Sequence, residues 1–265
     1  MRSSHTLFIL AVAACTELAG CASKASGPDL SASEAVASAA WAGPALPGSG
    51  VVPAWTHYLL PGKRATHYEF VHLDGRACVQ ASSSSSASML RMQMVIPGEA
   101  LGTLQFSWKV PALIHEADLS RREADDAPAR IMLAFDGDRG KLSAKDTMLS
   151  ELSRALTGEE MPYATLVYAW GHQRPAETIV THPRSDRVKV VVVESGPERL
   201  GQWLNYERDV RADFERAFGE APGTLIGVAL MTDSDNTGTA AHAWYGPVRF
   251  GTRTAEAGAS SPAPR

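Results

Sequence analysis

The stretch Leu104-Gln105-Phe106-Ser107-Trp108-Lys109-Val110 decides the fold, because apolar and polar side chains alternate along its whole length. Successive side chains of a β-strand point to opposite faces, so this alternation buries one face and leaves the other in water. The stretch Leu90–Ile96 repeats the pattern, with apolar Leu90, Met92 and Met94. Such strands are typical of antiparallel sheets that pack one face on a core.

The same reading, extended along the chain, predicts many short strands and few helices. Gly-containing pairs such as Asp136-Gly137 and Pro222-Gly223 break the apolar runs at turns. A helix is expected at Ala144–Leu156, and another at Val210–Phe218 that ends at Gly219. We therefore predict an all-β fold, a two-sheet antiparallel sandwich of jelly-roll-like topology with two short helices. The further predicted strands are Ala129–Phe135, Tyr163–Trp170, Arg187–Val193, Thr224–Met231 and Ala240–Phe250.

The first twenty residues have the layout of a lipoprotein signal peptide. Arg2 supplies a positive charge, and Leu7–Ala14 is an apolar run too short to span a bilayer. Leu18-Ala19-Gly20-Cys21 then matches a lipobox, in which the cysteine becomes the acylated N-terminus. We expect residues 1–20 to be removed and Cys21 to anchor the protein in a lipid bilayer.

Composition divides the rest of the chain into three parts. Residues 21–50 are expected to be a flexible tether, since 22 of the 29 positions after Cys21 are Ala, Ser, Gly or Pro. Residues 51–253 are long enough for one domain with a sizeable core, and residues 254–265 are expected to be a disordered tail. Ala22, in place of an aspartate after Cys21, favours the outer membrane, on its periplasmic or surface face.

Charge and cysteine content narrow the function classes. The formal net charge is −4 and the sequence has no basic stripe, so a nucleic-acid partner is not expected. Cys15 leaves with the signal peptide and Cys21 is acylated, so Cys78 remains alone and no disulfide can form within the domain. Its apolar neighbours predict that Cys78 is a small buried core residue. The serine run at 82–86 is expected to be a flexible hairpin loop.

The loop Asp233–Gly238 is a candidate calcium site. Asp233, Asp235 and Asn236 place three hard oxygen ligands in one tight turn, which suits Ca²⁺. The alternative is a turn in which these side chains bond to their own backbone, with no cofactor at all.

A second candidate is the pair Asp125-Asp126 followed by Arg130. Two carboxylates facing an arginine can act as an acid–base pair, grip sugar hydroxyls, or form an ion pair that pins the preceding loop. We expect Asp126, Arg130, Arg208 and Asp235 to form one network, because each lies where a strand joins a loop.

Aromatic residues near strand ends suggest glycan binding, since an aromatic face stacks on the apolar face of a sugar ring. The alternative is that about half of them are core. His172 follows one such strand and is a candidate ligand-binding residue, although no catalytic or metal-binding motif surrounds it. The aromatic candidates are Tyr168, Trp170, Trp203, Tyr206, Trp244 and Tyr245.

Several of these motifs together resemble domain-of-unknown-function family 3047, which occurs in exported bacterial proteins. They include Tyr168-Ala169-Trp170-Gly171 and the loop Met231–Gly238, and the likeness covers nearly all of residues 51–250. The resemblance implies a β-sandwich distantly similar to carbohydrate-binding modules and jelly-roll lyases. It implies no activity, because a fold does not determine a function.

We therefore expect a membrane-anchored envelope lipoprotein whose sandwich binds a glycan or another envelope component. One alternative is a polysaccharide lyase or glycoside hydrolase that uses the carboxylate–arginine cluster. The other is a structural envelope protein without a ligand. Open, unpaired carboxylates in a groove would favour the enzyme, an aromatic platform the binding protein, and mutual burial the structural protein.

Overall fold

The computed structural model describes residues 55–252. The predicted signal peptide, the acylation site Cys21, the tether 21–50 and the tail 254–265 lie outside these residues. No helix within the described part of the chain is long and apolar enough to span a membrane.

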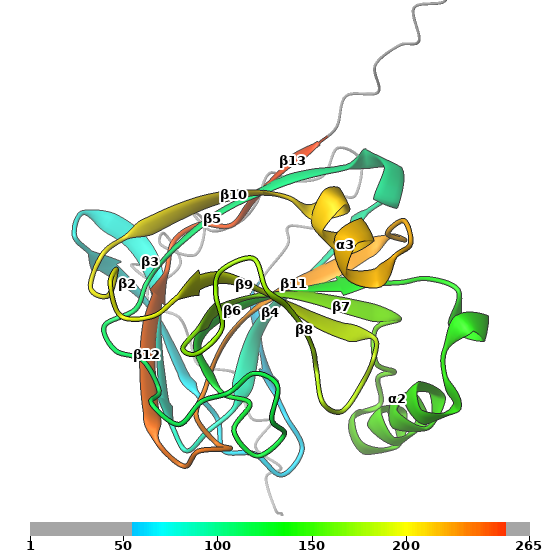
Figure 1. The fold of residues 1–265 in the computed structure, drawn as a ribbon, viewed down its shortest axis with the longest axis horizontal. Helices are drawn as coiled ribbons and strands as arrows, with labels where there is room; N and C mark the ends of the chain where they lie inside the picture. The colour runs from blue at the N-terminus through cyan, green and yellow to red at the C-terminus, as the bar shows by residue number, and fades with distance from the viewer. Residues whose placement is uncertain (1–54, 253–265) are drawn as a thin grey trace, which may run out of the picture.

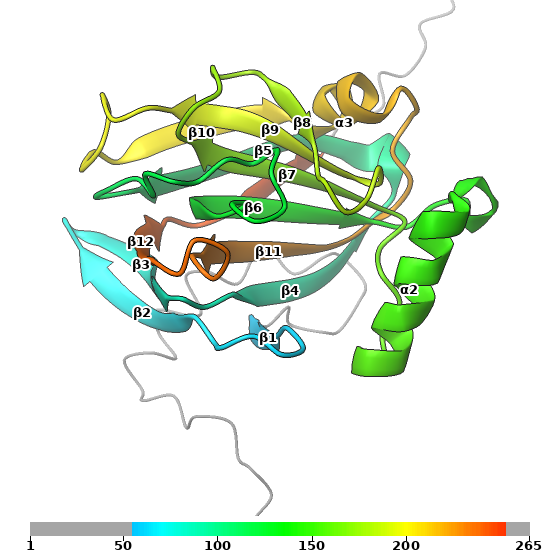
Figure 2. The ribbon, with the colours of Figure 1, turned by 60° about the horizontal axis from the view of Figure 1, so that its bottom comes forward.

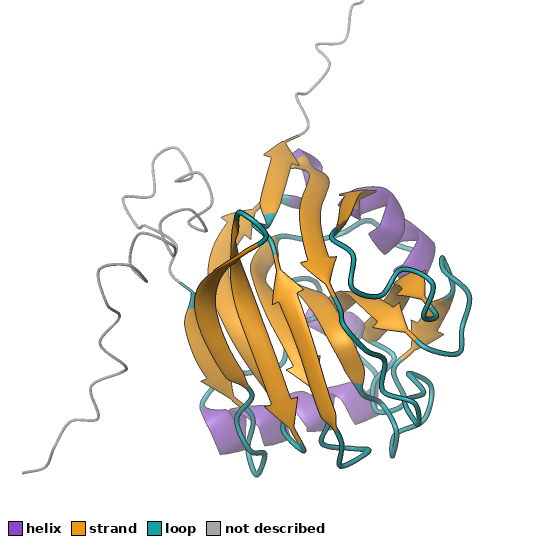
Figure 3. Ribbon diagram, turned by 90° about the vertical axis from the view of Figure 1, so that its left-hand side faces the viewer, coloured by secondary structure: helices purple, strands orange, loops and turns teal. Residues whose placement is uncertain are grey.

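The described chain folds into two packed β-sheets, which confirms the predicted all-β sandwich (Figures 1 and 3). In spatial order the seven-stranded sheet contains β1 (Thr56–Leu59), β4 (Ser88–Ile96), β11 (Leu225–Asp233), β6 (Ala127–Phe135), β7 (Ala164–Gly171), β9 (Val188–Ser195) and β8 (Ile179–Thr181). The six-stranded sheet contains β10 (Leu204–Asp209), β5 (Leu101–Lys109), β12 (Ala240–Tyr245), β3 (Arg76–Ser84) and β2 (His67–Leu73), with β13 (Arg249–Thr252) paired to β5.

One strand pair departs from the predicted antiparallel pattern. The chain leaves β7, forms β8 at the sheet edge and returns in β9 between the two. Strand β9 is therefore antiparallel to β8 and parallel to β7. All other pairs of described strands are antiparallel.

The core lies between the sheets and follows the alternation read from the sequence. Leu104, Phe106 and Trp108 point inward from β5 and are buried, and Leu90 and Met92 do the same from β4. Full burial of such side chains stabilises the fold by roughly 1.5–3 kcal/mol each. Cys78 is also buried, as predicted.

Both predicted helices are present, and each ends at a glycine in the left-handed conformation. Helix α3 (Val210–Phe218) has the predicted bounds, and Asp209 caps its start by accepting a hydrogen bond from the Ala212 backbone. At its end, Gly219 (φ 71°) donates its N–H to the Glu215 carbonyl. Helix α2 (Ala144–Thr157) is capped at its start by the Ser143 side chain, which accepts a hydrogen bond from the Asp146 backbone, and at its end by Gly158 (φ 80°).

Helix α2 does not bury the apolar stripe that its sequence contains. Met148, Leu152 and Leu156 are 53–62% exposed, whereas Asp146 and Ser150 face the protein. Asp146 accepts a hydrogen bond from the Ser185 hydroxyl at 2.6 Å, so polar contacts attach the helix. In Figure 2, α2 lies at the right-hand side of the domain, outside the two sheets.

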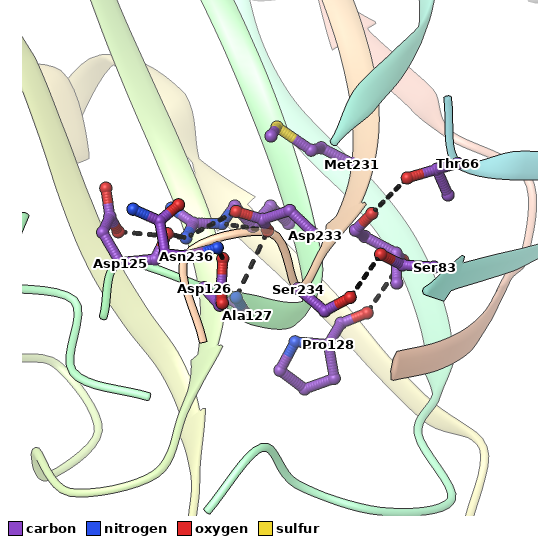
Figure 4. A network of polar contacts seen from close by, with 12 residues as sticks. Thr66, Ser83, Asp125, Asp126, Ala127, Pro128, Met231, Asp233, Ser234 and Asn236 are labelled. Carbon is purple, nitrogen blue, oxygen red and sulfur yellow. Dashed lines mark hydrogen bonds and ion pairs between the residues drawn. The ribbon is translucent and has the colours of Figure 1, made fainter. Parts of the chain in front are cut away.

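Two local predictions were wrong. The strand predicted at 240–250 is divided between β12 and β13, because Gly246 and Pro247 interrupt the pairing. The serine run is not a flexible loop: Ser83 and Ser86 are almost fully buried and hydrogen-bonded to each other. The Ser83 hydroxyl also bonds to the Ser234 hydroxyl at 2.7 Å, which ties this turn to the end of β11 (Figure 4).

Candidate functional site

A groove of about 520 Å³ lies on the outer face of the seven-stranded sheet. Its floor is formed by the side chains that alternate with the core positions, such as Met132 between buried Ile131 and Leu133 on β6. The floor is largely apolar, and methionines dominate it. Tyr58 is the one aromatic side chain among the described residues that line it.

The strand register explains why the groove is hollow. Met231 of β11 lies opposite Arg130 of β6, and the next outward position on β11 is the small Ala229, opposite Met132. One further step along β6, Ala134 continues the row of small side chains. Small residues flanked by longer ones leave a depression in an otherwise regular sheet surface.

Arg130 lies at one end of this groove, between two buried carboxylates. Its Nε donates to Asp233 Oδ1 at 3.0 Å, and its Nη2 donates to Asp125 Oδ1 at 3.0 Å. The Arg130 side chain is 6% exposed, and the two carboxylates are 4% and 9% exposed. Burial of these charges is tolerated because each is paired and hydrogen-bonded.

His182 completes the environment of Asp125. Its Nδ1 accepts a hydrogen bond from the Arg184 backbone, so Nε2 carries the proton that it donates to Asp125 Oδ2 at 2.8 Å. Both oxygens of Asp125 and both ring nitrogens of His182 are therefore engaged. Neither group is free to accept a proton from a ligand in this arrangement.

The two carboxylates on Arg130 have opposite pKa shifts. Burial opposes ionisation of Asp125, but Arg130 and His182 outweigh it and lower its pKa to about 2. Burial raises the pKa of Asp233 to about 7, since Arg130 compensates only in part and Asp125 and Asp126 repel its charge. The single guanidinium of Arg130 therefore faces the negative charge of more than one carboxylate.

Asp126 turns away from Arg130 and holds the loop after β11. Its carboxylate accepts hydrogen bonds from the Asn236 N–H at 3.2 Å and from the Thr237 N–H and hydroxyl, both at 2.7 Å. Figure 4 shows Asp125, Asp126 and Asp233 converging from two segments of the chain. The loop Asp233–Gly238 is closed by a carboxylate from another segment rather than by its own side chains alone.

The predicted calcium ligands are only partly brought together. Oxygens of Asp126, Asp233 and Asp235 lie within 4.8 Å of one another, whereas the Asn236 side-chain nitrogen donates to the Arg122 carbonyl at 2.5 Å. Lys63 forms an ion pair with Asp235, and Arg130 with Asp233. Protein cations and backbone N–H groups therefore already satisfy these oxygens, and nothing further here points to a metal ion.

The predicted single network of Asp126, Arg130, Arg208 and Asp235 was wrong. Arg208 belongs to a separate cluster at α3, where it bonds to Asp213 and to Glu177. It lies on β10 in the other sheet, so the strand ends that looked equivalent in the sequence belong to different layers.

Three of the predicted binding aromatics are core residues. Tyr168, Trp170 and Tyr245 are fully buried, because each lies at the inward phase of its strand. The Tyr245 hydroxyl donates to the Met231 carbonyl at 2.7 Å and joins the two sheets behind the groove. His172 does not line the groove either; its ring contacts that of His115, with centroids 5.5 Å apart.

A second hollow, of about 540 Å³, lies on the six-stranded sheet and includes none of the predicted site residues except Tyr206. Trp203 and Trp244 are half-buried outside its lining, and their indole nitrogens bond to Asp74 and Gln80. The groove on the seven-stranded sheet therefore contains the larger share of the predicted site.

Several groove residues were not predicted from the sequence. Arg91 forms a two-pronged ion pair with Glu159 (2.6 and 3.0 Å) and lies 4.3 Å above the Tyr58 ring. Met132 lies within the predicted strand Ala129–Phe135, and Met89 directly precedes the predicted strand Leu90–Ile96. Their outward phase was a usable signal, but pairing of β4, β11 and β6 was needed to place them side by side.

No curated protein sequence matches the chain. The xyloglucanase domain of NopAA, a type three effector from Sinorhizobium fredii in complex with cellobiose, is similar over 76% of this chain and 94% of its own, with 8% identity and a TM-score of 0.40. The model of the family described as protein of unknown function (DUF3047) matches residues 53–249. The chain therefore belongs to the DUF3047 family.

Proposed function

We propose that this domain is a glycan-binding protein and that the groove on the seven-stranded sheet is its binding site. The described residues form no aromatic platform, and the mutual burial of Arg130, Asp125 and Asp233 by itself fits the structural alternative. The observation that carries the proposal is instead the groove beside them, whose apolar floor is bordered by polar side chains. A sugar chain has apolar ring faces and hydroxyl groups along its edges, and such a lining complements both. A volume of about 520 Å³ is in the range of small-molecule sites.

Binding accounts for the groove better than hydrolysis or lyase chemistry. A general acid or base needs a carboxylate or imidazole within reach of the ligand. All the carboxylates that line the groove are ion-paired within the described structure. Their ion-pair partners are Arg130 for Asp125 and Asp233, Lys63 for Asp235, Arg91 for Glu159, and Arg139 and Arg154 for Glu160. His182 adds a hydrogen bond to Asp125.

The test is a glycan array probed with the purified, labelled chain and with a variant whose groove is filled. Ala134→Phe adds bulk to the floor at a partly exposed position, so we expect a folded protein that no longer binds. Val95→Phe is the matched control, because Val95 is 61% exposed and does not line the groove. Equal binding by Ala134→Phe and wild type would show that the ligand site is elsewhere.

We further propose that acylated Cys21 attaches the protein to the outer membrane. The lipobox at 18–21 supports this, together with the tether that would separate the domain from the lipid. Cys21→Ser should release the protein into the soluble fraction or leave it unprocessed, as measured by fractionation and intact mass. Mature, membrane-bound Cys21→Ser protein would contradict lipidation.

A further inference from the structure

We infer that the groove selects uncharged glycans, and that Nη1 of Arg130 is the donor that contacts a neutral oxygen of the ligand. The inference rests on the proposed function and specifies the class of ligand.

The first observation is that one nitrogen of a buried arginine has no protein partner. Nε and Nη2 of Arg130 make all four of its side-chain hydrogen bonds within the described structure, to Asp233 and to the side chain and carbonyl of Asp125. Nη1 makes none. Among the described residues, the side-chain polar atoms that are sealed from solvent and lack a hydrogen-bond partner belong to Arg91, Trp108, His172 and Arg174. Nη1 of Arg130 is not one of them, so it is accessible from outside the protein. Since Arg130 lines the groove, Nη1 is reached from there.

A donor that has no protein partner, and that a bound ligand would close off from water, favours a ligand that supplies an acceptor. Leaving it unpaired in a closed complex weakens binding by about tenfold or more, so a ligand that supplies an oxygen is favoured over one that does not. The position is also rigid, because Asp125 and Asp233 hold the guanidinium from two sides. This is the arrangement expected of a group that fixes ligand orientation.

The second observation is that the charge of Arg130 is already compensated. Asp125 and Asp233 contact it directly, and Asp126 lies close enough to raise the pKa of Asp233. A carboxylate or phosphate placed at Nη1 would meet these negative charges across a few ångströms. A hydroxyl or acetal oxygen would gain the same hydrogen bond without that repulsion.

The third observation is that the positive and negative side chains that line the groove are equal in number. Five carboxylates face five cationic side chains along the groove, with His182 in addition. Only one of these cations, Arg184, has no ion pair within the described residues, and its side chain is exposed, where its attraction for an anion is screened. The five carboxylates are Asp125, Glu159, Glu160, Asp233 and Asp235; the five cations are Lys63, Arg91, Arg130, Arg139 and Arg184.

The experiment compares neutral and acidic glycans on the array, including oligogalacturonates as free acids and as methyl esters, which share one sugar backbone and differ at each carboxyl in charge and in one methyl group. We expect the glycans that bind the purified full chain to be uncharged. Their affinity should change less than about twofold between about 50 and about 500 mM NaCl, because no ligand charge is screened. Preference for acidic glycans with strong salt dependence would overturn this inference and leave glycan binding intact. Binding to no glycan at all would overturn both.

Two variants test the role of Arg130. Arg130→Lys keeps a positive charge between the carboxylates but has no Nη1, so affinity for the neutral ligand should fall by about tenfold or more. Unchanged affinity in a folded Arg130→Lys protein would refute the assignment. Asp125→Asn leaves the guanidinium under-compensated and keeps a similar side-chain shape. We expect it to raise the ratio of acidic-glycan to neutral-glycan affinity by about tenfold. A ratio that stays at its wild-type value would refute the inference that Asp125 compensates the charge of Arg130, whether or not Arg130→Lys folds.

Discussion

Arg130 and Arg208 each lie between two carboxylates, yet only one of them is saturated. Arg208 uses all three guanidinium nitrogens, with Nε and Nη2 on Asp213 and both Nη atoms on Glu177. Arg130 is more deeply buried, at 6% against 16% side-chain exposure, and still leaves Nη1 free. The saturated Arg208 at a helix fits a structural role, whereas the open donor of Arg130 at the groove supports the proposed ligand contact. The difference lies in their surroundings and not in the residue types.

Removal of Arg130 should have the largest effect. Arg130→Ala leaves Asp125 and Asp233 buried without their shared partner, so we expect the free energy of unfolding to fall by roughly 3–5 kcal/mol. Denaturant melts beside wild type measure this, with glycan binding assayed on the fraction that remains folded. A loss below about 1 kcal/mol with intact binding would mean that Arg130 behaves as an ordinary surface charge.

Removal of Arg208 should cost less and should spare binding. Arg216 remains to pair with both Asp213 and Glu177, and Glu177 is 49% exposed. We therefore expect Arg208→Ala to lose about 2 kcal/mol of unfolding free energy, with unchanged affinity on the glycan array. A binding defect in folded Arg208→Ala protein would erase the distinction between the two arginines.

The pH dependence of stability should identify Asp233 as the carboxylate of the Arg130 cluster whose ionisation destabilises the folded state. The folded-state pKa of Asp233 is about 7, above its ordinary value of 3.8, so its contribution favours folding at low pH and is lost as pH rises from about 4 to about 7. The side chain of the Asp233→Asn variant cannot ionise, so the variant does not lose this stability as the pH rises. We expect the stability of the variant relative to wild type to rise by on the order of 1 kcal/mol between pH 5 and pH 8. Thermal melts across this range provide the measurement, with exposed Asp186→Asn as the control.

Calcium should have the smallest effect. Because Lys63, Arg130 and backbone N–H groups already satisfy the oxygens of Asp126, Asp233 and Asp235, chelator or about 1 mM calcium should move the melting temperature by less than about 1 °C. A calcium-dependent rise of several degrees would instead show that a metal displaces these protein contacts.

Much of the fold could be predicted from the sequence, since alternation acts over a few residues. The inward phase of Leu104, Phe106 and Trp108, and the glycine end of α3, are local properties. The candidate site was predicted less well. Asp125, Arg130, Asp233 and Asp235 do gather at one place. Of the aromatic candidates, about half were expected to be core, but the sequence did not show that Tyr168 and Trp170, both at inward positions of β7, are among these.

By itself the sequence determined which residues form strands, where the helices stop, and that the domain has no disulfide within it. These outcomes depend on side-chain periodicity, backbone conformational preference and cysteine content, which neighbouring residues or simple counts supply. Only the tertiary structure decided the partners of the charges. His182 comes to Asp125 and Lys63 to Asp235 across long sequence separations, while Arg208 goes to the other sheet. Strand order sets those encounters, and strand order arises from packing the two sheets around one core.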